Sequence, residues 1–286
     1  MSNLSPEHSF QPLSVGNVVS AGVRLYRSNL KRYLILVLRS YLWSLIPIYG
    51  WAKSIEISGR ISRLAYQELI DQPETIMEAF QKTDRQIWNF LVAGLLMGLI
   101  NFGLIIGFFI GYLVFSLLTF GVLTLFRAGN APTTVNVVAS ILVALAFLVF
   151  LLVAFLIWLR VFSRLFIYEV PLAIEENLDG AGTIGRSWTL TKGSVGRVQL
   201  IVLVASLITW TILSPASFFL FAFIGAGVST TNNSDAASVL FLLLFYGTIL
   251  LGSALVIPFW QAIKAVVYYD LRSRREGLGL ELRDRG

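Results

Sequence analysis

Uncharged apolar runs dominate the pattern of hydrophobic and polar positions, and several are long enough to cross a lipid bilayer. A helical crossing takes about 20 apolar residues. The longest run, residues 87–126, holds no charged residue. A single helix over that run would be about twice as long as the hydrocarbon layer is thick. The pattern therefore predicts two spans there, joined by a short turn near residues 101–107 that would include Asn101.

Four further runs bring the predicted number of spans to six. They cover residues 33–51, 137–159, 198–223 and 239–267, with Arg39 and Pro47 inside the first run, Pro215 inside the third and Pro258 inside the last. The expected fold is an all-α polytopic helical membrane protein with about six transmembrane helices and amphipathic interfacial helices on the cytoplasmic side. The expected organisation is a disordered tail (1–12), one helical membrane domain (13–272) and a basic cytoplasmic tail (273–286).

The distribution of Lys and Arg predicts which segments lie in the cytoplasm, because cytoplasmic loops of membrane proteins are enriched in these residues. The loop 225–238 has none and is expected outside, whereas the basic segment 160–197 and both termini are expected inside. The segment 52–86 conflicts with this assignment. It would lie outside, yet it carries Lys53, Arg60, Arg63, Lys82 and Arg85. Either the rule is broken there, or the first apolar run is re-entrant and the count differs.

Two segments before apolar runs have the pattern of amphipathic helices. In the first, an apolar face is formed by Val15, Val18, Val19, Gly22, Leu25 and Tyr26. In the second, Ala181, Ile184 and Trp188 share a face opposite Arg186. Such helices lie flat in the membrane interface, with cations near lipid phosphates. Residues 15–45 and 180–210 resemble each other as a possible weak repeat, although chance similarity of two such units is an equal alternative.

Composition supports a membrane protein and argues against an enzyme. Hydrophobic residues make up 56% of the chain and charged residues 13%, against about 25% charged in soluble domains. The chain has no cysteine and a single histidine, His8, in the polar N-terminal stretch. It has no phosphate-binding loop, zinc-protease, nucleophile-elbow or dinucleotide motif. No catalytic, cofactor-binding or metal-binding residue is predicted, and the net charge of +6 is assigned to contact with anionic lipid rather than with nucleic acid.

Candidate lipid or substrate contacts are basic residues on the expected cytoplasmic side. Arg39 is the clearest, because a charge within a span is costly and marks function by default; the alternative is an arginine that merely reaches back to the interface. The wider set is Arg24, Arg27, Arg186, Lys192, Arg197, Arg272, Arg274 and Arg275. The acids Glu169, Glu175 and Glu176 are expected to be solvated loop charges.

Glycines spaced by four residues predict close helix packing. Gly94 and Gly98 form one pair, and Gly103, Gly107 and Gly111 form a longer series. Small residues at this spacing let helix backbones approach each other in lipid. The contact would lie within the chain, with a protein partner or in a homo-oligomer; the alternative is that glycine is common in membrane helices.

Three stretches resemble a family of uncharacterised bacterial polytopic proteins. They are "LSVGNVVSAGVRLYRSNLKRYL", "VPLAIEEN…GTIGRSWTLTKGSVGR" and "PFWQAIKAVVYYDLRSRREGLGLEL". This family is often labelled as the membrane domain of glycerophosphoryl diester phosphodiesterases, from proteins in which it is fused to a separate enzyme domain. That chemistry relies on several histidines and a metal-binding acidic cluster, so the resemblance implies no activity here. It implies a helical domain of a bacterial inner membrane or an internal photosynthetic membrane.

The expected function is therefore non-catalytic. The protein would bind anionic lipid of the cytoplasmic leaflet, or a partner protein, in membrane organisation or complex assembly. The alternative is a transporter or permease component for a small molecule or lipid, favoured by the prolines within spans, Arg39 and the possible repeat. The scarcity of ionisable groups within spans weighs against ion-coupled transport.

Overall fold

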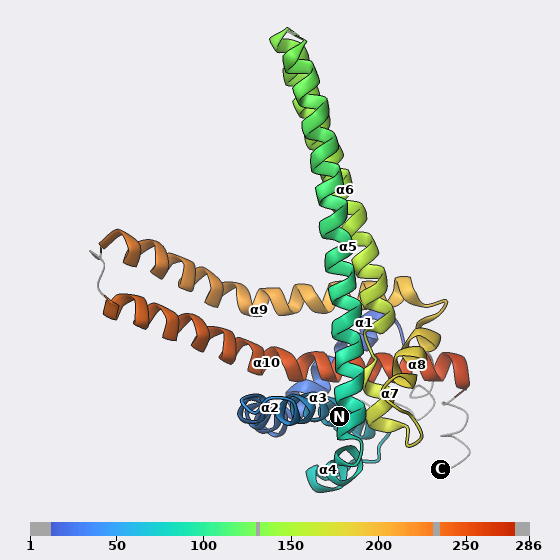
Figure 1. Ribbon diagram of the computed structural model, residues 1–286. Coiled ribbons are helices and arrows are strands. Elements are labelled where there is room, and N and C mark those ends of the chain that lie inside the picture. The colour runs from blue at the N-terminus through green and yellow to red at the C-terminus, as the bar shows by residue number, and fades with distance from the viewer. Residues whose placement is uncertain (1–12, 130–131, 231–234, 278–286) are drawn as a thin grey trace.

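The computed structural model describes residues 13–129, 132–230 and 235–277, and all the regular secondary structure in these ranges is α-helical. The helices follow one another along the chain without a strand between them in the described part (Figure 1). They are α1 (Val15–Ser28), α2 (Leu30–Ser44), α3 (Tyr49–Leu69), α4 (Ile76–Asp84), α5 (Ile87–Ala128), α6 (Thr133–Leu165), α7 (Glu169–Ile174), α8 (Gly182–Thr191), α9 (Val195–Thr230) and α10 (Asp235–Glu276).

The helices form a base from which two long hairpins project in different directions (Figure 1). One hairpin is α5 with α6, and the other is α9 with α10. By length and composition, three helices of the described part can cross a membrane, or four if the sharply bent pair α8–α9 counts as one span. The prediction of a helical protein with membrane-spanning helices is confirmed to this extent, and the prediction of about six spans is not.

The run 87–126 forms one helix, so the predicted turn at residues 101–107 is wrong. Helix α5 has 42 residues, which corresponds to roughly 63 Å. Asn101 lies inside it, and its side-chain amide donates to the carbonyl of Met97 at 2.8 Å. The run offers no residue that has to leave the helical conformation, and lipid-facing backbone is best satisfied by continuing the helix. The predicted interruption at Pro215 is likewise wrong, since α9 continues through that position.

The run 33–51 forms a helical hairpin rather than a span. Helix α2 has 15 residues, roughly 22 Å, which is shorter than the hydrocarbon layer. The chain turns after Ser44, passes through Ile48 with a φ of 62°, and returns as α3. The Tyr41 hydroxyl lies 2.7 Å from Ser253 Oγ of α10. Helix α2 therefore runs beside a part of α10 that belongs to a candidate span.

Helix α3 occupies the centre of the base, where it packs against α2, α5, α7 and α10. Its apolar side chains join the largest core cluster together with those of α1, α2, α9 and α10. This position explains why a helix rich in charged residues is mostly buried. Helix α4 packs on it and begins with a capping box, in which Thr75 and Glu78 bond each other's backbone.

The two predicted amphipathic helices form, but the apolar face of α1 is buried within the protein and is not free to lie on lipid as predicted. Val18, Val19, Gly22 and Leu25 are buried, and α1 packs on α10. A Cβ atom at Gly22 would lie 2.4 Å from the Ile263 side chain, so glycine allows this close approach.

In α8 the predicted apolar face is exposed at Trp188, so its contact with lipid stays a prediction. The buried face includes Ser187 and Thr191, whose hydroxyls donate to the Arg164 carbonyl at 2.8 and 3.3 Å. These bonds hold a polar face of α8 against the end of α6, a contact that hydrophobic periodicity does not reveal.

Candidate anion-binding groove

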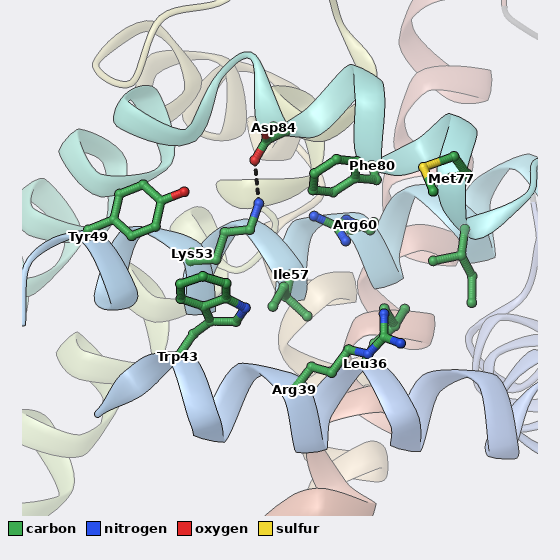
Figure 2. A pocket seen from close by; sticks show the side chains of 11 residues that line it. Leu36, Arg39, Trp43, Tyr49, Lys53, Ile57, Arg60, Met77, Phe80 and Asp84 are labelled. Atoms are coloured by element: carbon green, nitrogen blue, oxygen red, sulfur yellow. Dashed lines mark hydrogen bonds and ion pairs between the residues drawn. The ribbon is translucent and has the colours of Figure 1, made fainter. Parts of the chain in front are cut away.

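A groove of ≈ 550 Å³ lies between α2, α3 and α4 (Figure 2). Its volume is within the usual range for sites that bind small molecules, about 300–1,000 Å³. Most of its lining is apolar or aromatic, with charged groups at a few points. The lining residues are Leu36, Arg39, Trp43, Tyr49, Lys53, Ile57, Arg60, Ile76, Met77, Phe80 and Asp84.

The cations that α3 brings to the groove have internal partners. Glu56, which is fully buried, accepts from Arg60 Nε at 2.9 Å and from Arg60 Nη2 at 2.6 Å. Thr83 of α4 also donates to Glu56. Lys53 forms an ion pair with Asp84 and lies 3.3 Å from Glu56. Successive turns of α3 thus place alternating charges opposite α4, and each charge is compensated.

An aromatic ring lies against both cations of α3. Phe80 of α4 has Lys53 Nζ at 4.6 Å and Arg60 Cζ at 4.7 Å from its centre. A ring face attracts cations through its quadrupole. Phe80 therefore fixes the two side chains on the wall of the groove and contributes apolar surface to it (Figure 2).

Arg39 differs from these cations, because it has no hydrogen bond or ion pair with the described residues. It extends from α2 on the opposite side of the groove from Phe80 (Figure 2). At the groove, three cations are opposed by only two carboxylates: the cations are Arg39, Lys53 and Arg60, and the carboxylates are Glu56 and Asp84. The one uncompensated charge of the groove is thus the guanidinium that sequence analysis selected.

A second ionic cluster fixes the connection between α3 and α4. Glu74 accepts from Arg63 Nε at 2.7 Å and from Lys82 at 2.6 Å, and Arg63 also donates to the Ala173 carbonyl at 2.6 Å. Burial acts to raise the pKa of Glu74, but the hydrogen bonds and charges of Arg63 and Lys82 outweigh it and hold this pKa below its usual value.

Several of the predicted lipid contacts have internal partners at the end of α10. Asp270 accepts from Arg197 at 3.0 Å, from Arg274 at 3.1 Å and from the Leu13 amide at 2.8 Å. Arg275 donates to the carbonyls of Thr189 and Lys192, which closes the end of α8. These bonds hold the beginning of the described chain, α8 and α9 against α10.

Arg186 and Arg272 also have internal partners. Arg186 lies 2.9 Å from Glu175 and 2.6 Å from Glu276, and Arg272 lies 2.9 Å from Glu276. By contrast, the side chains of Arg24, Arg27 and Lys192 are exposed and have no bond to the described residues. Lipid contact stays a prediction for all of these residues, but only this second group and Arg39 are free to make it without breaking an internal bond.

The expectation that the acids near α7 are solvated loop charges is wrong for two of them. Glu169 is buried and paired with Lys264 of α10. Glu175 accepts from Arg186 and, at 2.6 Å, from the Tyr268 hydroxyl. Glu176 is exposed as predicted. No group of three or more metal-binding side chains occurs among the described residues.

The predicted glycine contacts are of two kinds. A Cβ at Gly94 would meet Ile55 of α3 at 2.4 Å, and one at Gly111 would meet Phe150 of α6 at 3.4 Å. Gly98, Gly103 and Gly107 have nothing within 4 Å of that position. Gly94 and Gly111 therefore pack within the chain, whereas Gly98, Gly103 and Gly107 leave open surface on α5.

Arg39 is the one charge of the groove among the predicted site residues, whereas Lys53, Arg60 and Asp84 lie in the segment 52–86, which the pattern predicts to be a polar connection made of two helices. The available signal was the spacing of Lys53, Glu56 and Arg60 on one helix face, which pairs charges at i, i+3 and i, i+4.

Comparison with known proteins adds no assignment: no protein-family model, no curated protein and no solved structure matches the chain.

Proposed function

We propose that this protein is a non-catalytic integral membrane protein that binds lipid or a partner protein, in membrane organisation or complex assembly. The observation that carries the proposal is the free surface of α5. Of its 42 residues, the buried ones are Ile87, Phe90 and Ala93, all in the first two turns. Apart from the side that packs against α6, the remaining apolar surface is available to lipid or to helices of another protein, and the open glycines would let such a helix approach closely.

The arrangement also supports a topology with all basic segments on one face of the membrane. Helices α3 and α4 carry four of the five cations of segment 52–86, with Arg85 directly after α4, and they belong to the same base as α1, α8 and the end of α10. With both hairpins crossing the bilayer and the base on the cytoplasmic side, no basic segment conflicts with the positive-inside rule. The α2–α3 hairpin would then enter the membrane from that side and return.

The lengths of the hairpins fit this topology although they diverge (Figure 1). Helices α5 and α10 each have 42 residues, about 63 Å, against a hydrocarbon thickness of about 30 Å. Apolar helices longer than the bilayer adapt by tilting. Two divergent hairpins can therefore cross one bilayer with opposite tilts, and because such tilts reach only about 40°, the ends of helices of this length would project beyond the hydrocarbon layer.

The divergence of the hairpins favours binding over transport. A transport pathway requires helices that surround a common interior, with the binding site near the middle of the membrane. Here the groove lies in the base between α2, α3 and α4, away from the free parts of both hairpins (Figures 1 and 2). The transporter alternative retains Arg39 as its candidate contact and Pro258, which lies inside α10, as its second observation. Neither feature places a binding site between the two hairpins.

The test is native mass spectrometry of the chain extracted in mild detergent from its own membrane. The expected result is a stoichiometric protein partner, a homo-oligomer or one enriched lipid. Replacing Gly103 and Gly107 by leucine should release a protein partner bound to α5 while leaving the chain folded, since both sites face open space. A chain that carries neither protein nor lipid, and that conducts a solute in vesicles, would overturn the proposal in favour of transport.

A further inference from the structure

The geometry of the groove points to a specific ligand class, and we infer that it binds one acidic phospholipid, with the phosphate on Arg39 and an acyl chain along α3 and α4. This inference rests on the proposed membrane location and names the lipid that the proposed function leaves open.

The free charge sets the chemistry of the head group. Arg39 lacks an internal partner, whereas Lys53 and Arg60 are held by Asp84 and Glu56. A guanidinium presents a planar fork of donors that matches a phosphate in a bidentate way. Because the other charges of the groove cancel, a ligand with one net negative charge leaves the site neutral.

The floor of the groove is suited to a hydrocarbon chain rather than to a free anion. Leu36, Ile57, Ile76, Met77 and Phe80 supply most of it. Met77 is 64% exposed, so an acyl chain there would cover apolar surface that the protein leaves open. Burial of such surface is favourable by about 25 cal/mol per Å², a contribution that inorganic phosphate cannot make.

The groove also lies where lipid can enter it. Helix α2 exposes Ile35, Leu38 and Leu42 on its outer side. Two residues beyond Arg39, Tyr41 bonds to Ser253, which belongs to the candidate span Leu242–Glu276. Arg39 therefore lies next to the end of the apolar tip of the α2–α3 hairpin, at the level where phosphates of the adjacent leaflet would be found.

The test measures lipid affinity of the full chain in mild detergent by native mass spectrometry, with titration of phosphatidylglycerol. Arg39→Gln should weaken binding about tenfold, because a charge-assisted bidentate contact is lost. Met77→Trp, which fills the floor without altering charge, should also weaken it. Lys31→Gln is the matched control, because Lys31 is another exposed cation of α2 without a partner among the described residues but lies outside the groove. Arg39→Gln is expected to fold, since it breaks no internal bond.

Three results would overturn the inference. Equal binding by the Arg39 and Lys31 variants would remove the role of the groove. Equal affinity for zwitterionic phosphatidylcholine would remove the charge argument. If inorganic phosphate displaced phosphatidylglycerol at concentrations similar to those at which the lipid itself binds, the groove would be a site for a free anion. Extraction at alkaline pH separates this inference from the proposed function: a chain that stays in the membrane without Arg39-dependent binding contradicts the inference alone, whereas a released chain contradicts the membrane location.

Discussion

At the scale of single residues, the charges of α3 are structural although they line a groove. Glu56 is fully buried and accepts from Arg60 and Thr83. Removal of one member of a buried pair leaves the other charge without compensation, which costs about 3–5 kcal/mol. We expect Glu56→Ala to lower the free energy of unfolding by about 3 kcal/mol, the smaller figure because Arg60 borders a groove that water reaches.

The measurement is thermal or denaturant unfolding of the detergent-solubilised chain. Glu176→Ala is the control, since this carboxylate is exposed and has no bond to the described residues. Equal shifts of the unfolding midpoint in the two variants would contradict a structural role for Glu56.

Glu74 makes the stability of the folded chain depend on pH. Burial acts to raise its pKa, but Arg63 and Lys82 hold the pKa below its usual value of 4.5. The unfolded chain therefore binds a proton at higher pH than the folded chain does. The contribution to stability is present above about pH 4.5 and is lost as the pH falls through the folded-state pKa. We expect the unfolding midpoint of the wild-type chain to fall in this acid range, and that of Glu74→Gln to fall less there. A parallel decline in both chains would show that other groups dominate.

At the scale of elements, hydrophobic periodicity predicts the buried residues of a helix when only its apolar side has to be covered. The periodicity of α1 identified its buried residues, because an apolar stripe on a polar helix has to be covered whatever covers it. It did not identify the cover, which is α10. In α8 the periodicity did not reveal that Ser187 bonds to the Arg164 carbonyl of α6. In the run 87–126 the apolar pattern was read correctly but its length was divided wrongly, since nothing local marks the depth at which a helix leaves the membrane.

In the candidate site, too, the sequence reveals what a local pattern determines and does not reveal what depends on tertiary contacts. Arg39 could be found because a lone cation in an apolar run is conspicuous in the sequence. The opposite wall could not, since it depends on α4 folding back onto α3, and that contact is fixed by tertiary ion pairs rather than by local pattern.

Contacts between elements give a matched pair of glycine substitutions. A Cβ at Gly59 of α3 would lie 2.5 Å from the Phe90 ring of α5, whereas one at Gly98 meets nothing within 4 Å. We expect Gly59→Ala to destabilise the chain by about 1–3 kcal/mol through overpacking. Gly98→Ala should be neutral or stabilise by up to about 1 kcal/mol, because alanine favours the helix. Unfolding midpoints of the two variants test this directly, and a loss of stability in Gly98→Ala would show that its surface is covered in the folded protein.

At the scale of the whole molecule, the proposed topology removes the conflict in the charge distribution. Four of the five cations of segment 52–86 lie in α3 and α4, Arg85 follows directly after α4, and these helices share the base with the other basic segments. The conflict arises only if residues 33–51 are a complete span. Because α2 is only 15 residues long and turns back into α3, the proposed topology returns the chain to the side on which α2 begins.

Cysteine labelling can decide between the two topologies, since the native chain has no cysteine. With both hairpins crossing and the base on one side, Gln81→Cys in α4 and Glu176→Cys should react with an impermeant maleimide from the same face. Arg127→Cys, at the far end of α5, should react from the opposite face, because α5 crosses the bilayer between them. Six spans predict instead that Gln81→Cys reacts from the face opposite to Glu176→Cys. Ser62→Cys serves as the internal control: Ser62 is fully buried, so labelling of that site only after denaturation shows that the base was folded during the experiment.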